Sequence, residues 1–332
     1  MWCPSPTDDR RARPNSRVIV TSLILVLTIA STSWQAGAAQ KEVASTESFP
    51  SEESKHLLVD VADLDVRLRN ADVDSIEADV LLHISGTSDD KAQRWVENHT
   101  PVFTDSKDRL EIVVEPAKSG FLWFGSLTAR ARLSLLAPQE IVPDITTTSG
   151  SIQIRGDFPN ARPLLLRTST GNINVDGAAA AIDFRTAAGD AQIRVIRPLE
   201  SLIARSSSGD VNLAGGARHV SVDTASGRIS LQNLSGNAEV STSTGKITLS
   251  WDRLEPGARV RVRSSSGRVQ LVIPAGTRPQ GTLTTTTGSV RSEFPGEVIE
   301  GGMTLRLSGD GPTFDVETAS SEIQLTVSEV WQ

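Results

Sequence analysis

Short stretches in which apolar and polar residues alternate recur along most of this chain of 332 residues. Val260-Arg261-Val262-Arg263 is one such stretch, and Phe314-Asp315-Val316-Glu317 is another. Alternation with a period of two residues is typical of β-strands that bury one face. A run of small residues follows each stretch, with a glycine in every copy but the last, and then comes a second alternating stretch such as Ile229-Ser230-Leu231. Each unit therefore predicts a strand, a tight turn, a second strand and a looser return.

The turn belongs to an eight-residue phrase that the chain repeats. A hydroxyl residue leads, two small residues and a glycine follow, and two aliphatic positions close the phrase. The nine copies begin at Thr147, Thr168, Thr186, Ser206, Thr224, Thr242, Ser264, Thr285 and Thr318. Eight copies carry the glycine, at intervals of 18 to 22 residues: Gly150, Gly171, Gly189, Gly209, Gly227, Gly245, Gly267 and Gly288. We expect these turn glycines to adopt a positive φ angle, which is costly for a residue with a Cβ.

Units this short cannot bury an apolar face alone, so neighbouring units must stack. Rungs about 4.8 Å apart would form a rod on the order of 40 Å long. Its interior would hold aliphatic ladders such as Ile229, Ile247, Val269 and Val290, and the leading Ser/Thr hydroxyls would lie near the turn backbone. We therefore predict an all-β protein, a β-solenoid similar to a parallel β-helix. A meander of hairpins is the alternative, because the sequence does not fix strand direction.

Residues 1–39 have the features of a signal peptide. Four arginines precede an apolar run of thirteen residues from Val18 to Ala30, and small residues occupy positions 36–39. Such a short run favours a cleaved leader, with an uncleaved anchor extending to Trp34 as the alternative. Cleavage after Ala38 or Ala39 would also remove Cys3, the single cysteine, so the mature protein would have no disulfide. We expect export to the periplasm or the cell surface.

The rest of the chain divides into three parts. Residues 40–55 are polar and rich in Ser and Glu, which predicts a linker. Residues 56–140 are expected to form an irregular β-rich region that caps the first rung, and residues 141–332 the solenoid. The capping region holds four strand candidates and, after Ser88 as a possible N-cap, one helix candidate: Leu57–Val61, Ile76–Ile84, Leu110–Val114, Ala131–Leu136 and Asp89–Asn98.

The phrases TTSGSIQI, SSSGDVNL, TASGRISL, TSTGKITL and SSSGRVQL, after an export signal, resemble the bacterial putative adhesin family of β-strand repeats. This family is also called the toastrack-type domain, formerly a domain of unknown function. The resemblance covers about residues 57–325. It implies a non-catalytic extracytoplasmic domain that acts as an adhesin or senses the envelope, with no catalytic residues. The last copy departs from the pattern because Ser321 replaces its glycine.

Composition excludes several functional classes. The formal charge of −7 leaves no basic footprint for nucleic acid. None of the four histidines forms a close pair with another, so we expect no metal and no cofactor. The serines of the turns recur in copy after copy, whereas a nucleophile is needed once.

A polysaccharide-active enzyme is the sharpest alternative, because parallel β-helices include lyases and hydrolases. That chemistry needs clustered carboxylates. Asp190 and Asp210 follow consecutive turn glycines, but Arg228 and Lys246 occupy the same column. We therefore expect a solvated edge and no enzyme.

Charges also flank the turns in an ordered way. Arg185 with Asp190 and Arg205 with Asp210 are opposite in sign, whereas Arg263 with Arg268 and Glu317 with Glu322 are alike. We interpret these charges as exposed residues that form weak ion pairs at the surface. A patterned face for a partner or an anionic glycan is the alternative.

Aromatic residues are scarce, yet three lie between Gly120 and Gly125: Phe121, Trp123 and Phe124. We expect them to cover the open apolar end of the first rung. The alternative is an exposed contact with a partner or membrane, or self-association through an aromatic tip.

These observations predict an exported, non-enzymatic β-solenoid that binds or scaffolds at the bacterial cell envelope. An envelope protein or a glycan is the expected partner. The alternatives are ligand sensing coupled to a membrane partner, and a polysaccharide-active enzyme.

Overall fold

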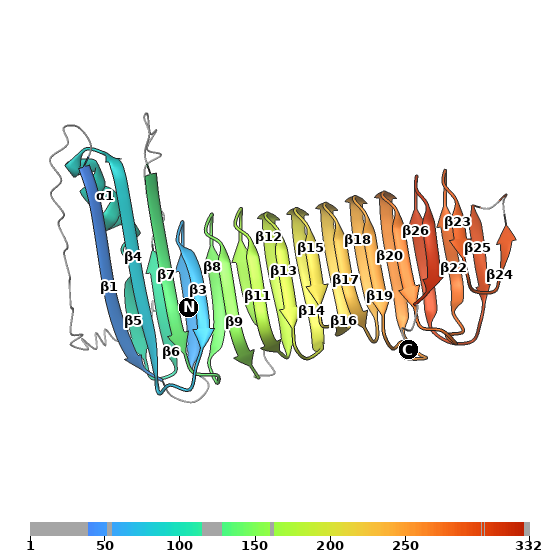
Figure 1. Cartoon of the computed structure of the whole chain (residues 1–332), viewed down its shortest axis with the longest axis horizontal. Helices are drawn as coiled ribbons and strands as arrows, with labels where there is room; N and C mark the ends of the chain where they lie inside the picture. Colours follow the sequence, from blue (N-terminus) through green and yellow to red (C-terminus); the bar gives the residue numbers. More distant parts are fainter. Residues whose placement is uncertain are drawn as a thin grey trace, which may run out of the picture.

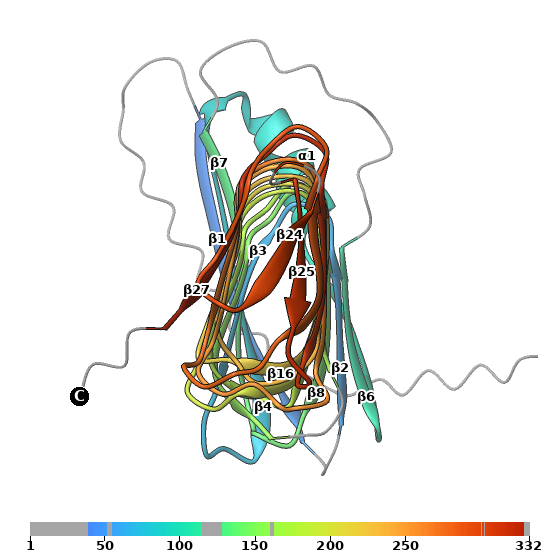
Figure 2. The ribbon, with the colours of Figure 1, turned by 90° about the vertical axis from the view of Figure 1, so that its right-hand side faces the viewer.

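The computed structural model describes residues 39–51, 55–114, 128–159, 163–299, 301 and 303–328. These residues form 27 strands in two sheets, which run along a rod with α1 (Asp89–His99) at one end (Figure 1). Viewed along the rod, the strands of each sheet lie behind one another as two facing layers (Figure 2).

Both sheets follow the rod, and the order of their strands in space differs from their order in the chain. In spatial order, sheet A contains β1 (Ala39–Pro50), β4 (Ser75–Thr87), β7 (Thr128–Ala137), β3 (Asp65–Asn70), β9 (Ile152–Phe158), β11 (Ile173–Ala179), β13 (Ala191–Val195), β15 (Val211–Ala214), β17 (Ile229–Leu234), β19 (Ile247–Trp251), β21 (Val269–Ile273), β27 (Ile323–Val327) and β23 (Val290–Ser292). Sheet B contains β24 (Gly296–Ile299), β25 (Thr304–Ser308), β22 (Gln280–Thr285), β26 (Thr313–Thr318), β20 (Arg259–Ser266), β18 (Ala238–Thr244), β16 (Ala217–Ser226), β14 (Leu199–Ser208), β12 (Ala181–Ala188), β10 (Leu164–Thr168), β8 (Val142–Thr147), β2 (His56–Val61), β6 (Arg109–Val114) and β5 (Val102–Ser106).

Each repeat contributes one strand to each sheet, and equivalent strands pair in parallel. Ile229 of β17 pairs with Ile247 of β19, which pairs with Val269 of β21. All three side chains are fully buried between the sheets. The predicted all-β solenoid is therefore confirmed, and the meander of hairpins is wrong because its repeat strands would pair antiparallel.

The turn glycines stack on one another. A Cβ on any of the eight would lie 1.9–2.2 Å from a backbone oxygen of the neighbouring rung. The expected positive φ occurs at five of them but not at Gly150, Gly171 or Gly288. At these three positions the φ expectation is wrong, and the close approach between rungs alone explains why a side chain is absent.

The leading hydroxyl residues are buried beside these turns. Eight of the nine are buried; Ser206 is half-buried. Their hydrogen bonds vary along the stack. Thr168 Oγ1 donates to the Gly150 carbonyl at 3.2 Å and accepts from the Gly171 N–H at 3.0 Å, so it satisfies turn groups that strand pairing leaves unpaired. The buried hydroxyls of Thr186, Ser264 and Thr318 have no hydrogen-bond partner among the described residues.

At the N-terminal end, the first rung along the chain is not the outermost. The rung of β2 and β3 pairs in parallel with β8 and β9 on one side and with β6 and β7 on the other. The expected boundary at residue 140 therefore does not coincide with a break in either sheet. The helix lies where the sequence predicted it, with Ser88 at the N-cap position but without a side-chain cap bond.

The linker expected at residues 40–55 is mostly a strand. β1 pairs antiparallel with β4 along its whole length. Val43 and Phe49 face inward, and Phe49 stacks on Phe103 of β5 at a centroid distance of 5.3 Å. The alternation was hidden because Ser45 and Glu47 occupy other inward positions of this edge strand.

At the C-terminal end the chain folds back on itself. The last rung along the chain, β26 and β27, lies between the rung of β20 and β21 and the rung of β22 and β23. Its core residues Phe314, Val316, Ile323 and Leu325 are fully buried. The less apolar rung of β22 and β23 and the antiparallel pair β24–β25 are left at the end.

Candidate functional site: the outer face of sheet B

Two adjoining hollows lie on the outer face of sheet B. The first has a volume of about 480 Å³ and crosses β14, β16, β18, β20 and β26. The second, of about 450 Å³, lies further along β16, β18, β20 and β26 and includes β22. Strand alternation creates this face: in β16, Val220 and Val222 point into the core, so Ser221 and Asp223 point outward.

The two hollows differ in chemistry. The first is lined by charged and amide side chains together with Ser201 and Ser221: His219, Asn237, Glu239, Arg259, Arg261 and Asp315. The second is lined mainly by hydroxyl groups: Ser241, Ser243, Ser265, Thr284 and Thr286. Both offer hydrogen-bonding groups from successive rungs rather than from one loop.

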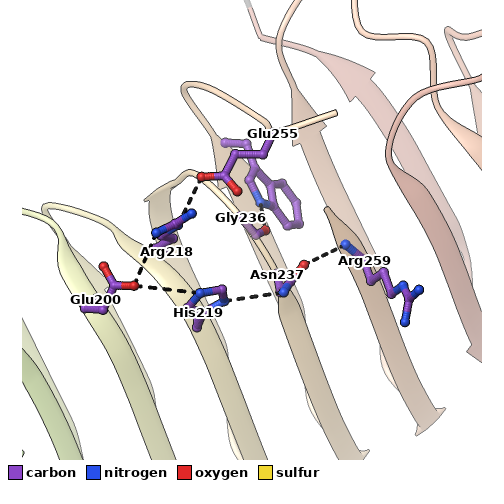
Figure 3. Close-up of polar contacts among 8 residues, drawn as sticks. Glu200, Arg218, His219, Gly236, Asn237, Glu255 and Arg259 are labelled. Carbon is purple, nitrogen blue, oxygen red and sulfur yellow. Dashed lines mark hydrogen bonds and ion pairs between the residues drawn. The ribbon is translucent and has the colours of Figure 1, made fainter. Parts of the chain in front are cut away.

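A polar network fixes the rim of the first hollow (Figure 3). Glu200 Oε1 lies 3.4 Å from Arg218 Nη1 and 3.8 Å from His219 Nε2, and Arg218 Nε lies 3.1 Å from Glu255 Oε1. Asn237 Nδ2 lies 3.4 Å from His219 Nδ1, while its Oδ1 accepts the Arg259 N–H at 2.8 Å. These contacts link four rungs, so the rim is held by side chains as well as by strand pairing.

The carboxylates of the first hollow are paired with arginine. Arg261 lies 3.7 Å from Glu239 and 3.3 Å from Asp315, so one guanidinium serves both. Within the described residues, no group of three or more His, Cys, Asp and Glu side chains is placed to hold a metal ion.

Asp190 and Asp210 do lie on neighbouring rungs, on the opposite side of the turn from the hollows. Asp190 Oδ1 accepts the Asp210 N–H, and Asp210 Oδ1 accepts the Arg228 N–H, each at 2.8 Å. Asn172 Oδ1 bonds to the Asp190 N–H in the same way. These side chains therefore form a ladder that caps strand starts, which gives them a structural role.

The other residues singled out in the sequence have different positions. The turn glycines form the stack of turns, where the close approach between rungs leaves no room for a side chain. Phe121, Trp123 and Phe124 lie outside the described residues, as does the leader up to residue 38. Among the described residues, no helix has the length and apolar character that a membrane span requires.

A match to a known protein family extends over most of the chain. The model of the Toastrack DUF4097 family matches residues 54–326. The chain belongs to this family. The matched residues include those that line both hollows and all nine copies of the phrase. No curated protein matches this toastrack chain.

Solved structures resemble this toastrack protein at low identity. A putative lipid binding protein from Parabacteroides distasonis ATCC 8503 is 12% identical over 89% of this chain and 98% of its own, with a TM-score of 0.47. A putative adhesin from the same strain is 11% identical over 86% of this chain and 97% of its own, with a TM-score of 0.39. A putative adhesin from Bacteroides fragilis NCTC 9343 is 10% identical over 89% and 98%, with a TM-score of 0.34.

Sequence reasoning missed the residues that line the hollows of sheet B in this toastrack protein. His219 appeared only as a histidine without a metal partner, and Asn237 and Arg259 were not singled out. A signal was present, because Asn237 lies 18 residues after His219, which is one repeat. Equal positions in successive repeats become neighbours across rungs.

Proposed function

We propose that this toastrack protein is exported and acts without catalysis, as a binding or scaffolding protein at the bacterial cell envelope. Its binding surface is the outer face of sheet B. The observation that carries the proposal is the pair of adjoining hollows, which share β16, β18, β20 and β26 and present polar side chains from successive rungs.

The form of this surface favours an extended ligand. Five neighbouring strands about 4.8 Å apart cover roughly 20 Å along the rod, so a polymer can contact several rungs at once. Small-molecule sites are usually enclosed clefts, whereas these hollows lie on an outer sheet face. The first combines polar side chains with apolar surface, and the second is lined mainly by hydroxyl and charged groups.

The absence of catalysis is supported by how the carboxylates are used. Glu239 and Asp315 share Arg261, and Asp190 and Asp210 accept backbone N–H groups. A general acid or base must instead reach the proton that it transfers. Export is supported by the basic, apolar and small-residue segments of residues 1–39.

The test is binding of the purified chain from Gln40 onward, without the leader, to cell envelopes isolated from the source bacterium, measured by co-sedimentation. Ser221→Trp places a large side chain in the first hollow at an exposed position. Thr248→Trp is the matched control, because Thr248 points outward from sheet A. We expect the wild type and Thr248→Trp to sediment with envelopes and Ser221→Trp to remain in solution.

Two results would contradict the proposal. A wild-type chain that does not sediment with envelopes would refute binding at the envelope. Equal sedimentation of both tryptophan variants would show that the ligand does not use the outer face of sheet B.

A further inference from the structure

Three arginines occupy one register position on successive rungs of sheet B. Arg167 of β10 pairs with Arg185 of β12, and Arg185 pairs with Arg205 of β14. Their strand neighbours point into the core, so the three side chains point outward, about 4.8 Å apart along the rod. We call Arg167, Arg185 and Arg205 the arginine ladder.

Stability does not explain the arginine ladder. Like charges directly opposite each other in a sheet are destabilising. Arg167 is paired with Asp144 at 2.8 Å. Arg185 and Arg205 are exposed, and neither has a carboxylate at ion-pair distance within the described part of the chain.

Three outward arginines near the C-terminal end of the solenoid are neutralised, unlike Arg185 and Arg205. Arg261 lies beside Asp315, Arg263 beside Glu317 at 3.4 Å, and Arg268 beside Glu322 at 3.3 Å. The inserted rung of β26 and β27 supplies these carboxylates. In the arginine ladder only Arg167 receives such a complement, from Asp144 of the neighbouring strand β8; among the described residues, no neighbouring rung supplies an ion-pair partner to Arg185 or Arg205.

The surroundings leave the guanidinium groups accessible. The next outward residue after each arginine is small and exposed: Ser169, Ala187 and Ser207. Besides Asp144, two acidic side chains lie near the ladder on this face. Asp183 precedes Arg185 on β12, and Asp223, next in register after Arg205, accepts the Ser241 hydroxyl at 2.5 Å.

The arginine ladder also leads into the second hollow. In register after Arg205 come Asp223, Ser241 and Arg263, which line that hollow. One row along the rod therefore begins with three cationic groups and continues through Asp223, Ser241 and Arg263, beside the hydroxyl groups of the second hollow.

We propose that the arginine ladder binds a linear polysaccharide that carries a carboxylate on each sugar, aligned with the rod axis. This inference rests on the proposed function and names its ligand class. Guanidinium groups bind carboxylates with two parallel hydrogen bonds, so a chain with regularly repeated carboxylates can contact more than one arginine of the ladder. The hydroxyl groups of the second hollow suit the remaining sugar hydroxyls.

The experiment measures binding of the full-length chain to polygalacturonate by isothermal titration calorimetry. The test variant is Arg185→Gln/Arg205→Gln. The matched control is Arg155→Gln/Arg194→Gln, which changes the net charge equally on the outer face of sheet A. We expect the test variant to bind about tenfold more weakly, since each lost exposed contact is worth up to about fivefold, and the control to bind like the wild type.

Stability and a second variant separate recognition from folding. Removing two stacked like charges should leave the melting temperature of Arg185→Gln/Arg205→Gln unchanged or higher. Asp183→Asn, which removes a neighbouring negative charge, should bind polygalacturonate more tightly than the wild type.

Several results would overturn the inference. Equal weakening in both double variants would show that only net charge matters. Equal affinity for pullulan, a neutral polysaccharide, would show that carboxylates are not recognised. Tighter binding to polyphosphate or to anionic lipid vesicles would assign the arginine ladder to another anion. Envelope binding that Ser221→Trp abolishes but Arg185→Gln/Arg205→Gln does not would refute the arginine ladder while the proposed function stands.

Discussion

Replacing four glycines by alanine, one at a time, separates the two reasons why a turn lacks a side chain. Gly257 has ordinary φ, and no other atom lies within 4 Å of the position that its Cβ would take; Gly276 has φ +78° and equally open surroundings. Gly171 has ordinary φ, but a Cβ would lie 1.9 Å from the Gly150 oxygen. Gly267 combines φ +153° with a Cβ 1.9 Å from the Gly245 oxygen.

The structure gives the size of each effect. Gly257→Ala should be neutral or stabilise by up to about 1 kcal/mol through the unfolded chain. Gly276→Ala should cost about 1–2 kcal/mol from backbone strain. Gly171→Ala must push two rungs apart, which strains the bonds from Thr168 Oγ1 to Gly150 and from the Ile152 N–H to Asn172. Two such bonds are worth about 2 kcal/mol.

Gly267→Ala combines the backbone strain expected for Gly276→Ala with the displacement of rungs expected for Gly171→Ala. It should therefore lower the free energy of unfolding by about 4 kcal/mol. Urea unfolding followed by circular dichroism would rank the four variants by their midpoints. Equal stability of Gly171→Ala and Gly257→Ala would refute the claim that contact between stacked turns excludes a side chain at Gly171. A loss at Gly276→Ala equal to that at Gly267→Ala would assign the whole effect to φ.

Three further predictions follow from the ladders, the ion pairs and the leader. Asp190→Ala should lose about 1 kcal/mol because the Asp210 N–H loses its acceptor, whereas Asp190→Asn keeps an oxygen there and should match the wild type in urea unfolding; equal losses would contradict this. Arg263→Glu should cost about 0.5 kcal/mol by repelling Glu317, and adding Glu317→Arg should restore it; no recovery would show that the pair is not coupled. Mass spectrometry of the exported chain should place its first residue at Ala39 or Gln40, whereas full-length chain in the membrane fraction would favour an anchor at Val18–Trp34.

The repeating part of the fold was predictable because its determinants are local. Two alternating stretches and a glycine turn define one unit, and a fixed spacing makes equivalent residues neighbours. Ile229, Ile247 and Val269 were predicted as an interior ladder, and they pair in register. Val290 was predicted as its next member, but Ile323 lies between Val269 and Val290, and Val290 is half-buried. The sequence could not show that Gly171 lacks a positive φ, because a close approach between two backbones and a left-handed turn both require glycine.

The order of rungs at the ends was not predictable. Every rung presents similar apolar ladders, so the alternation pattern is compatible with any neighbour. Arg263 and Glu317 are far apart in the chain, and each appeared only with a like charge across its own turn. Their pairing between β20 and β26 shows that charge complementarity accompanies the insertion of the last rung.

The binding face was only partly predictable. Alternation identifies Ser221 and Asp223 as outward residues, but it does not say which outward positions gather around a hollow. That depends on register between rungs, which irregular repeat lengths obscure: Asn237 follows His219 by 18 residues, while Arg259 follows Asn237 by 22. The Arg167, Arg185 and Arg205 row could have been found by aligning the residues that precede each phrase.

Hydroxyl-radical footprinting of the full-length chain, with and without envelope fragments, tests most directly whether sheet B is the binding face. Ile203 and His219 line the first hollow, while Val272 points outward from sheet A and Ile196 is 70% exposed beyond β13. We predict that envelope fragments lower the oxidation of Ile203 and His219 and leave Val272 and Ile196 unchanged. Protection of Val272 without protection of Ile203 and His219 would contradict the assignment of the binding face to sheet B.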